Sequence, residues 1–280
     1  MQMGTGILWK TVTLDVEEGT FNVLCGKSGC GKSTLLRQLK SDLAPYGSKS
    51  GRICYYGQNL TEIDHRQQSQ EIGYVLQNPE NQIVTDKVWH ELAFGLESLG
   101  YDTPSIRLRV AEMASYFGIH QWFYKNVSEL SGGQKQLLNL AAIMAMHPKL
   151  LILDEPTSGL DPKERIRFRN LISELAEEGI ILLSTHIVSD VESIANEILF
   201  MGEGQIVDSG SPAELIEGIS RRVKAWECVM EKREAEIYRE RYRVSNLKIE
   251  AEGARLRILS EVRPCPQAVQ SPLSLEDAFL

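Results

Sequence analysis

Short apolar runs alternate with segments of helical periodicity along most of the chain. Apolar runs at Phe21–Cys25, Leu150–Leu153 and Ile180–Leu183 predict strands. The last two runs are continuous, which is typical of strands buried on both faces of a parallel sheet. Between the runs, apolar residues recur every three or four positions, as in helices with one buried side. The pattern predicts an α/β fold with a parallel core sheet.

Weaker patterns predict further elements beside this core. Loose alternation, edge-strand composition or a short apolar run marks each additional strand, and one more helix is expected near the end of the core. The predicted strands are Ile7–Val16, Arg52–Gly57, Glu71–Leu76 and Ile198–Met201, and the predicted helix is Asp190–Ile194. A longer, polar-faced helix is predicted at Lys163–Glu178.

A block of helical periodicity interrupts the α/β pattern. Apolar residues recur at spacings of three and four from Val84 to Val127, with a break at Gly100, and a further helix follows from Ser128 to Met146. We expect a helical subdomain, inserted at about residues 84–130, in a larger domain that covers residues 1–218. Alternation on either side of Gly253 predicts a hairpin in a small α+β appendage at residues 219–280.

Composition narrows the classes of protein. The chain has 280 residues, 42% of them hydrophobic, and a formal net charge of −8, which disfavours a general nucleic-acid binder. No run reaches the ~18 to 20 apolar residues of a membrane span, and the start lacks the features of a signal peptide. The five cysteines show no CxxC spacing. We therefore expect a cytoplasmic protein with reduced thiols.

A glycine-rich loop stands between the first core strand and a helix. Its residues are Gly26, Lys27, Ser28, Gly29, Cys30, Gly31, Lys32, Ser33 and Thr34. Glycines at these positions let backbone N–H groups converge on phosphate oxygens. The pattern predicts that Lys32 reaches the β- and γ-phosphates, that Ser33 binds Mg²⁺, and that Thr34 lies nearer the α-phosphate. The alternative is a glycine-rich turn with a solvated lysine.

Two adjacent carboxylates end a core strand. Asp154 and Glu155 directly follow the apolar run Leu150–Leu153, and open parallel sheets bind ligands at this edge. We expect Asp154 to hold Mg²⁺, directly or through water, and Glu155 to deprotonate the attacking water. The alternative is an acid pair that caps a helix or lies in solvent.

Several motifs together resemble one family. Leu130-Ser131-Gly132-Gly133-Gln134, with the phosphate loop upstream and Leu-Ile-Leu-Asp-Glu-Pro downstream, resembles the ATPase subunit of ATP-binding cassette (ABC) transporters over roughly residues 7–215. The resemblance implies a P-loop NTPase fold, a RecA-like parallel core sheet with an antiparallel β edge. It also implies ATP and Mg²⁺ as ligands, a second ATPase subunit, a transmembrane subunit, and a place at the cytoplasmic face of the membrane.

The resemblance assigns roles to residues outside the loop and the acid pair. It implies that Gln77 senses Mg²⁺ and the membrane subunit, and that His186 holds the γ-phosphate. It also implies that Asp161 lies in a loop that crosses the dimer interface. The residues expected to contact ATP held by the other subunit are Ser131, Gly132, Gly133 and Gln134. A helix N-terminus, with free N–H groups, suits that anion.

Different parts of the chain resemble different subfamilies. Residues 77–82 and 84–99 resemble energy-coupling factor importer ATPases, which serve uptake of vitamins and transition-metal ions. Residues 184–192 and 275–280 resemble exporter ATPases for peptide antibiotics and drugs. A hybrid with a junction between Leu150 and Lys163 stays open. An exporter ATPase, a soluble cassette protein and an inactive nucleotide-binding remnant are the alternatives to an importer.

The start of the chain departs from the family pattern. Family members usually carry, well upstream of the phosphate loop, a strand and an aromatic residue that stacks on adenine, and this sequence begins too late to include them. Trp9 falls where the family places an apolar residue of the following strand. We therefore expect ATP and GTP to bind within a few-fold of each other.

Overall fold

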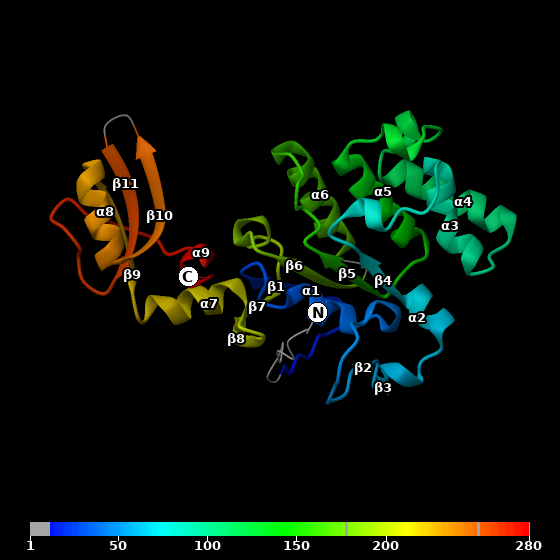
Figure 1. The fold of residues 1–280 in the computed structure, drawn as a ribbon, viewed down its shortest axis with the longest axis horizontal. Helices are drawn as coiled ribbons and strands as arrows, with labels where there is room; N and C mark the ends of the chain where they lie inside the picture. The colour runs from blue at the N-terminus through cyan, green and yellow to red at the C-terminus, as the bar shows by residue number, and fades with distance from the viewer. Residues whose placement is uncertain (1–11, 177–178, 251–252, 280) are drawn as a thin grey trace, which may run out of the picture.

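A six-stranded sheet forms the centre of the molecule (Figure 1). The computed structural model describes residues 12–176, 179–250 and 253–279. In spatial order the strands are β4 (Ile72–Val75), β5 (Leu150–Asp154), β6 (Ile180–Thr185), β1 (Phe21–Gly26), β7 (Glu197–Gly202) and β8 (Gln205–Gly210). Only β8 is antiparallel to its neighbour in this sheet. The predicted α/β class, with a parallel core and an antiparallel edge, is confirmed.

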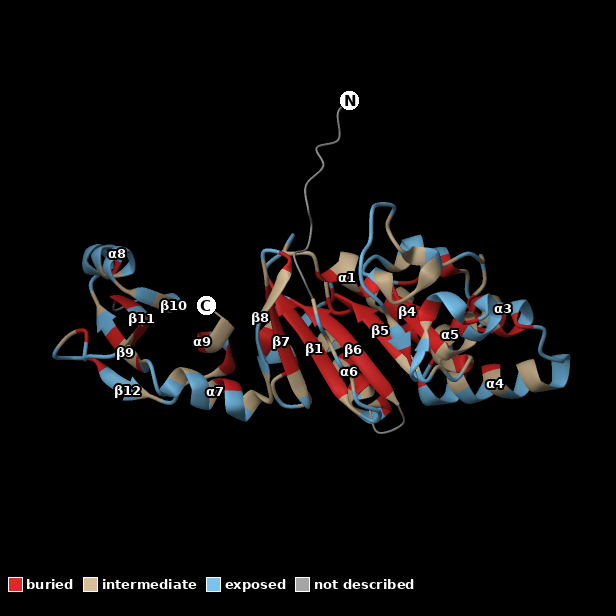
Figure 2. Ribbon diagram, turned by 90° about the horizontal axis from the view of Figure 1, so that it is seen from below, coloured by how far each residue is buried: buried red, intermediate tan, exposed pale blue. Residues whose placement is uncertain are grey.

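Both faces of this sheet are covered, which explains the continuous apolar runs. Along β5, Leu151 and Leu153 belong to one hydrophobic cluster and Ile152 to the other. The helix α1 (Lys32–Gln38) covers the second face through Leu36, whereas α6 (Pro162–Leu175) covers the first. Figure 2 shows the central strands as buried between the two layers. Each such leucine or isoleucine stabilises the fold by roughly 1.5–3 kcal/mol relative to exposure.

The predicted helical block is present beside β4 and β5. It consists of α3 (Val88–Ser98), α4 (Thr103–Tyr116) and α5 (Gly132–Ala145). Asp102 caps α4, accepting a hydrogen bond from the backbone N–H of Ser105 at 2.9 Å, and Gly118 follows that helix with a φ of 63°. Such a φ suits glycine, so the predicted stop has a physical cause. The treatment of this block as a separate subdomain stays a prediction.

A second, four-stranded sheet forms the C-terminal part, to the left in Figure 1. Its spatial order is β10 (Arg243–Glu250), β11 (Gly253–Ser260), β9 (Lys224–Met230) and β12 (Val269–Ser271). The helix α8 (Lys232–Arg241) packs on one face through Ala235. The predicted hairpin of β10 and β11 is confirmed, although part of its turn lies outside the described residues. The domain boundary near Gly218 stays a prediction.

Two helices connect the C-terminal part to the central sheet. The chain leaves β8 through α7 (Pro212–Ser220) and returns at its end as α9 (Leu275–Phe279). The rings of Phe279 and Phe200 are 5.6 Å apart. Leu275 is fully buried in the hydrophobic cluster that contains Leu151 and Leu153, which is called the main core below. The Arg257 guanidinium contacts the buried Asp277 carboxylate at 2.6 Å. The end of the chain therefore packs on both parts.

Several expected elements differ from the structure. Residues 12–16 of the predicted strand Ile7–Val16 are not in a strand, and residues 7–11, with Trp9, lie outside the described residues. Arg52–Gly57 contributes only β2 (Cys54–Tyr55), paired with β3 (Gln58–Asn59), and α2 (His65–Glu71) precedes β4. In place of a helix at Asp190–Ile194, a 3-10 turn spans Val188–Asp190.

The packing of Val188 and Val191 accounts for that last difference. Both side chains insert into the main core, with 3% and 2% exposure. Residues three apart align in a 3-10 turn, so a full α-helix is not needed to bury them. In the part of the chain that the structure describes, no helix is both long and apolar enough to cross a membrane.

Candidate functional site

The carboxyl ends of four adjacent strands place the predicted residues along one edge of the sheet. Asp154 at the end of β5 is level with Ser184 of β6, and Cys25 of β1 is level with Thr185. Glu155, His186 and the phosphate loop therefore follow at the same edge, with Gln77 beyond β4. Ligands of open parallel sheets bind at this edge.

The phosphate loop, residues 26–34, has a backbone that only glycines permit. A Cβ on Gly26 would lie 2.6 Å from the carbonyl oxygen of Met201, and Gly31 begins α1 with a φ of 107°. The side chain of Lys32 folds back under the loop, and its Nζ donates to the carbonyl oxygen of Gly26 at 2.7 Å. Lys32 is only 5% exposed, so the solvated-lysine alternative is wrong.

Asp154 receives three hydrogen bonds from hydroxyl groups. Ser33 Oγ and Ser184 Oγ donate to its Oδ1 at 2.8 and 2.9 Å, and the hydroxyl of Tyr74 lies 3.2 Å from its Oδ2. Burial and the Asp154 carboxylate raise the pKa of Tyr74, so this phenol stays protonated and donates. Asp154 is fully buried. The two predicted metal ligands Ser33 and Asp154 are therefore in direct contact.

Glu155 joins the phosphate loop to His186. One carboxylate oxygen lies 3.0 Å from Lys32 Nζ, and the other lies 2.6 Å from His186 Nδ1. The backbone of Glu155 has a φ of 48°, a conformation that costs about 1–3 kcal/mol for a residue other than glycine. Its N–H donates to Ser184 Oγ at 3.0 Å, which helps to hold it there. The acid pair is thus neither a helix cap nor solvated.

Gln77 is exposed at the same edge. Among the described residues, its side chain has no hydrogen-bond partner, so its predicted role stays a prediction. The loop around it, residues 76–82, is called the Gln77 loop below and is held by α5. Gln136 Nε2 donates to the carbonyl oxygen of Leu76 at 3.2 Å, and Asn139 Nδ2 donates to that of Pro79 at 3.1 Å. The N-terminal part of α5 and this loop are therefore directly linked.

Residues 131–134, which are expected to contact ATP held by the other subunit and are called the signature below, form the start of α5. Ser131 and Gln134 form a reciprocal capping box, in which the Gln134 N–H donates to Ser131 Oγ at 3.2 Å and the Ser131 N–H to Gln134 Oε1 at 2.9 Å. Ser131 and Gly132 are exposed, while the Glu164 carboxylate packs against Gly133 and accepts from Ser131 Oγ. In the described structure, no hydrogen bond joins these residues to the phosphate loop of the same chain.

Asp161 caps the helix α6. Its carboxylate accepts hydrogen bonds from the backbone N–H groups of Lys163 and Glu164 at 2.9 and 2.8 Å. The residue is exposed, while the neighbouring Leu160 is buried in the main core. The structure thus gives Asp161 a structural role as a helix cap, and its place at a dimer interface stays a prediction.

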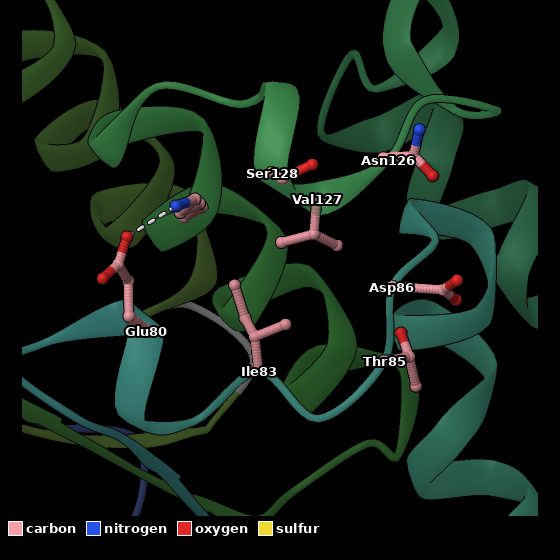
Figure 3. Close-up of a pocket in the computed structure, with 8 residues that line it drawn as sticks. Glu80, Ile83, Thr85, Asp86, Asn126, Val127 and Ser128 are labelled. Carbon is pink, nitrogen blue, oxygen red and sulfur yellow. Dashed lines mark hydrogen bonds and ion pairs between the residues drawn. The ribbon is translucent and has the colours of Figure 1, made fainter.

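A pocket of about 330 Å³ lies between the Gln77 loop and the helical block (Figure 3). An ion pair between Lys135 Nζ and Glu80 Oε1, 2.6 Å long, closes one side. The lining residues are Glu80, Ile83, Thr85, Asp86, Asn126, Val127, Ser128 and Lys135. Because it combines the loop after β4 with the start of α5, an occupant of this pocket would contact both.

Some residues of the site were not predicted from the sequence. Tyr74 and Ser184 reach Asp154 across neighbouring strands, and Gln136 and Asn139 hold the Gln77 loop. Ser184 had a signal, because it is a polar residue at the end of a core strand, directly before Thr185 and His186. Tyr74 lies inside an apolar strand, where the sequence gives no such sign.

A strand, a glycine loop with a buried lysine, and an acid pair on a neighbouring parallel strand define a P-loop NTPase. The family model for ABC transporters matches residues 9–158. The chain belongs to this family and contains an ABC ATPase domain, as the resemblance implied. A dimeric ATP-binding cassette bound to ADP and phosphate shares the fold, with a TM-score of 0.65 at 22% identity over 75% of this chain and 94% of that chain.

Relatives and a solved structure refine this placement. A putative ABC transporter ATP-binding protein of Bacillus cereus is 46% identical over 207 residues, which are 73% of this chain but only 37% of that relative. The energy-coupling factor transporter ATP-binding protein EcfA2 of Caldanaerobacter subterraneus is 36% identical over 77% of this chain and 76% of its own length. The structure of cbiO1 from Clostridium perfringens, described as part of the ABC transporter complex cbiONQ, has a TM-score of 0.66 at 31% identity, over 77% of this chain and 88% of that chain.

Proposed function

We propose that this chain binds and hydrolyses ATP as a subunit of an ABC membrane transporter. The observation that carries the proposal is the position of Glu155, whose carboxylate contacts both Lys32 of the phosphate loop and His186. A carboxylate fixed between a phosphate-binding lysine and a histidine is placed to orient and deprotonate a water next to the terminal phosphate. His186 then holds the γ-phosphate, and Lys32 the β- and γ-phosphates.

The residues present fit Mg²⁺ as the second ligand. Ser33 and Asp154 offer a hydroxyl and a carboxylate oxygen 2.8 Å apart, which are ligands that Mg²⁺ prefers. No cluster of three or more His, Cys, Asp or Glu side chains that suits a metal occurs among the described residues. That agrees with Mg²⁺ sites in which phosphates and water complete the shell. Bound there, Mg²⁺ would neutralise phosphate charge, and Gln77, which follows the neighbouring strand β4, would respond to it.

A second ATPase subunit completes the proposed site. Ser131 and Gly132 lie exposed at the start of α5, and in the described structure no hydrogen bond joins them to the phosphate loop of their own chain. Free N–H groups at such a helix start suit an anion supplied by another molecule. Two chains would then enclose two ATP molecules, each held by one phosphate loop and the other chain's signature. ATP would stabilise the pair, and hydrolysis would release it.

The pocket beside Glu80 is the proposed contact for the transmembrane subunit. It is formed in part by the Gln77 loop and the start of α5. A partner bound there would therefore contact both the loop that carries Gln77 and the helix that begins with the signature residues 131–134. The name of the relative EcfA2 supports an energy-coupling factor transporter as the partner. The proposed cargo, a vitamin or a metal ion taken up by the cell, follows only from the resemblance of residues 77–82 and 84–99 to importer ATPases. Such a subunit would lie peripherally at the cytoplasmic face of the membrane. The likeness of residues 184–192 and 275–280 to exporter ATPases stays a prediction.

The experiment combines a turnover assay with co-purification. The purified chain should hydrolyse ATP in the presence of Mg²⁺, and it should co-purify from its source with a membrane protein. Replacing Glu80 by Gln breaks the ion pair with Lys135, so it should reduce transport coupling in a reconstituted system while basal hydrolysis stays within about two-fold. Loss of basal hydrolysis in Glu80→Gln would overturn the coupling role. Absence of turnover in the unaltered chain would instead favour an inactive cassette.

A further inference from the structure

Two thiols of the C-terminal part lie in contact, although they are far apart in the sequence. Cys228 lies in β9 and Cys265 in the loop between β11 and β12, and their Sγ atoms are 3.4 Å apart. Neither belongs to the nucleotide site. We propose that Cys228 and Cys265 form a reversible disulfide, which makes this sheet a site of oxidation by peroxides.

The geometry requires only a small movement. A disulfide has an S–S length of about 2.05 Å, so the two sulfurs must approach each other by about 1.4 Å. Cys228 is held in place, because it pairs with Leu256 of β11 and the preceding Glu227 pairs with Val269 of β12. The loop around Cys265 can supply the movement, since it is a surface turn closed by the Ala268 N–H on the Cys265 carbonyl oxygen at 3.1 Å.

The two thiols differ in exposure, and this difference gives them different roles in the proposed oxidation. Cys228 is 1% exposed, and burial raises the pKa of its thiol to about 12. Cys265 is partly exposed and packs at the edge of the same hydrophobic cluster. Cys265 is therefore the thiol that an oxidant reaches. Cys228 stays protonated until its contact with an oxidised Cys265 brings the two sulfurs together, and its proton leaves with the displaced hydroxyl.

The oxidation balances with hydrogen peroxide as the oxidant. The Cys265 thiolate attacks one peroxide oxygen, the O–O bond breaks, and the departing hydroxide takes a proton to become water. This leaves a sulfenic acid on Cys265. Cys228 Sγ then attacks Cys265 Sγ, the S–O bond breaks, and the hydroxyl leaves as a second water with the proton of Cys228. The two sulfurs lose two electrons in total, and a dithiol reductant restores both thiols.

The chain offers an internal comparison. Cys54 is exposed in β2, and no cysteine partner contacts it in the described structure. Cys25 is fully buried, and burial raises the pKa of its thiol to about 12. An exposed thiol without a partner and a buried one without access should therefore both fail to form an internal disulfide.

The test is peptide mapping of the reduced, full-length chain after treatment with hydrogen peroxide. After free thiols are blocked with N-ethylmaleimide, mass spectrometry should find the Cys228 and Cys265 peptides linked, at least ten-fold more abundant than any link to Cys54, and dithiothreitol should remove the link. Cys54→Ser should behave like the unaltered chain. Cys228→Ser should accumulate a sulfenic acid on Cys265 that dimedone traps.

Two results would overturn the proposal. One is oxidation of Cys265 to the sulfinic acid in the unaltered chain, at the rate seen in Cys228→Ser, with no linked peptide. The other is a link that joins Cys265 to a cysteine other than Cys228. Cys265→Ser is a second test that stays valid if the buried substitution Cys228→Ser disturbs folding, because Cys265 is partly exposed. In Cys265→Ser, Cys228 should stay unmodified under the same peroxide treatment.

Discussion

Glu155 occupies a backbone conformation that residues other than glycine rarely adopt, and it is also the residue that joins Lys32 to His186. Its N–H donates both to the carbonyl oxygen and to the Oγ of Ser184. Ser184 Oγ in turn donates to Asp154. Ser184 therefore helps to fix both members of the acid pair.

Replacing Ser184 by Ala should lower both stability and turnover. The change removes two buried hydrogen bonds of about 1 kcal/mol each, so the free energy of unfolding should fall by about 2 kcal/mol. Because the acid pair loses its anchor, kcat for ATP should fall as well. Urea unfolding and steady-state hydrolysis measure the two effects. Replacing the exposed Ser189 by Ala is the matched control. An unchanged kcat in Ser184→Ala would mean that Ser184 contributes to stability but does not position the acid pair for hydrolysis.

The site residues that the sequence predicted are those whose chemistry follows from local spacing. The phosphate loop and the pair Asp154-Glu155 were found because the phosphate-binding pattern is contiguous and because strand ends meet at one edge. Tyr74 was missed because its bond to Asp154 depends on the register between β4 and β5. Side-chain contacts between strands that are distant in sequence leave no local pattern.

At the scale of elements, α5 links the signature to the Gln77 loop. Gln136 and Asn139 are both 1% exposed, and each donates one hydrogen bond to a backbone carbonyl of that loop. The amide oxygens of both residues have no partner within the described structure. Buried amides with an unpaired oxygen are costly, which favours a functional reason for keeping them.

Replacing Gln136 by Leu should loosen the loop without unfolding the protein. The lost hydrogen bond of about 1 kcal/mol predicts about five-fold faster amide hydrogen exchange at residues 77–82. Because the unpaired amide oxygen is removed as well, the global free energy of unfolding should change by less than about 1 kcal/mol. Exchange monitored by mass spectrometry tests this, with the α4 segment as the internal reference. Equal acceleration in α4 would mean general destabilisation instead.

The elements that the sequence predicted have strong periodicity, and those it missed have little. The core strands and the helices α3 to α6 were predicted because each buries a full apolar run or stripe. The helix α8 was missed because only Ala235 of its ten residues is buried. The helix predicted at Asp190–Ile194 was wrong, because the spacing of three between Val188 and Val191 suits a helical stripe but also suits the 3-10 turn that the structure has at Val188–Asp190.

At the scale of the whole molecule, a buried ion pair holds the end of the chain. The fully buried Asp277 of α9 contacts Arg257 of β11, while α9 packs on the main core through Leu275. Burial raises the pKa of Asp277, but the hydrogen bonds from Arg257 and the Ser274 N–H outweigh it and hold that pKa below its ordinary value of 3.8. The carboxylate therefore stays charged in the folded protein.

This pair predicts a pH dependence of stability. A lowered folded-state pKa gives stability that is complete above the unfolded value of about 3.9, and that is lost as the pH falls through the folded value. Asp277→Asn should be less stable than the unaltered chain by about 2 kcal/mol at pH 6, and the difference should shrink below about pH 4. Urea unfolding from pH 6 to pH 3 measures it. The exposed Glu276→Gln on the same helix should show no such change, and a constant difference at all pH values would contradict the linkage.

The oligomeric state of Glu155→Gln with ATP and Mg²⁺ tests most directly whether two chains enclose ATP and hydrolyse it with Glu155. The amide keeps the shape of the carboxylate but cannot act as a base, so ATP should bind and not be hydrolysed. Size-exclusion chromatography with light scattering should then show a dimer that needs ATP. The double variant Lys32→Ala/Glu155→Gln, which lacks a phosphate contact, should stay monomeric. A Glu155→Gln variant that binds ATP by calorimetry yet remains a monomer would contradict the account.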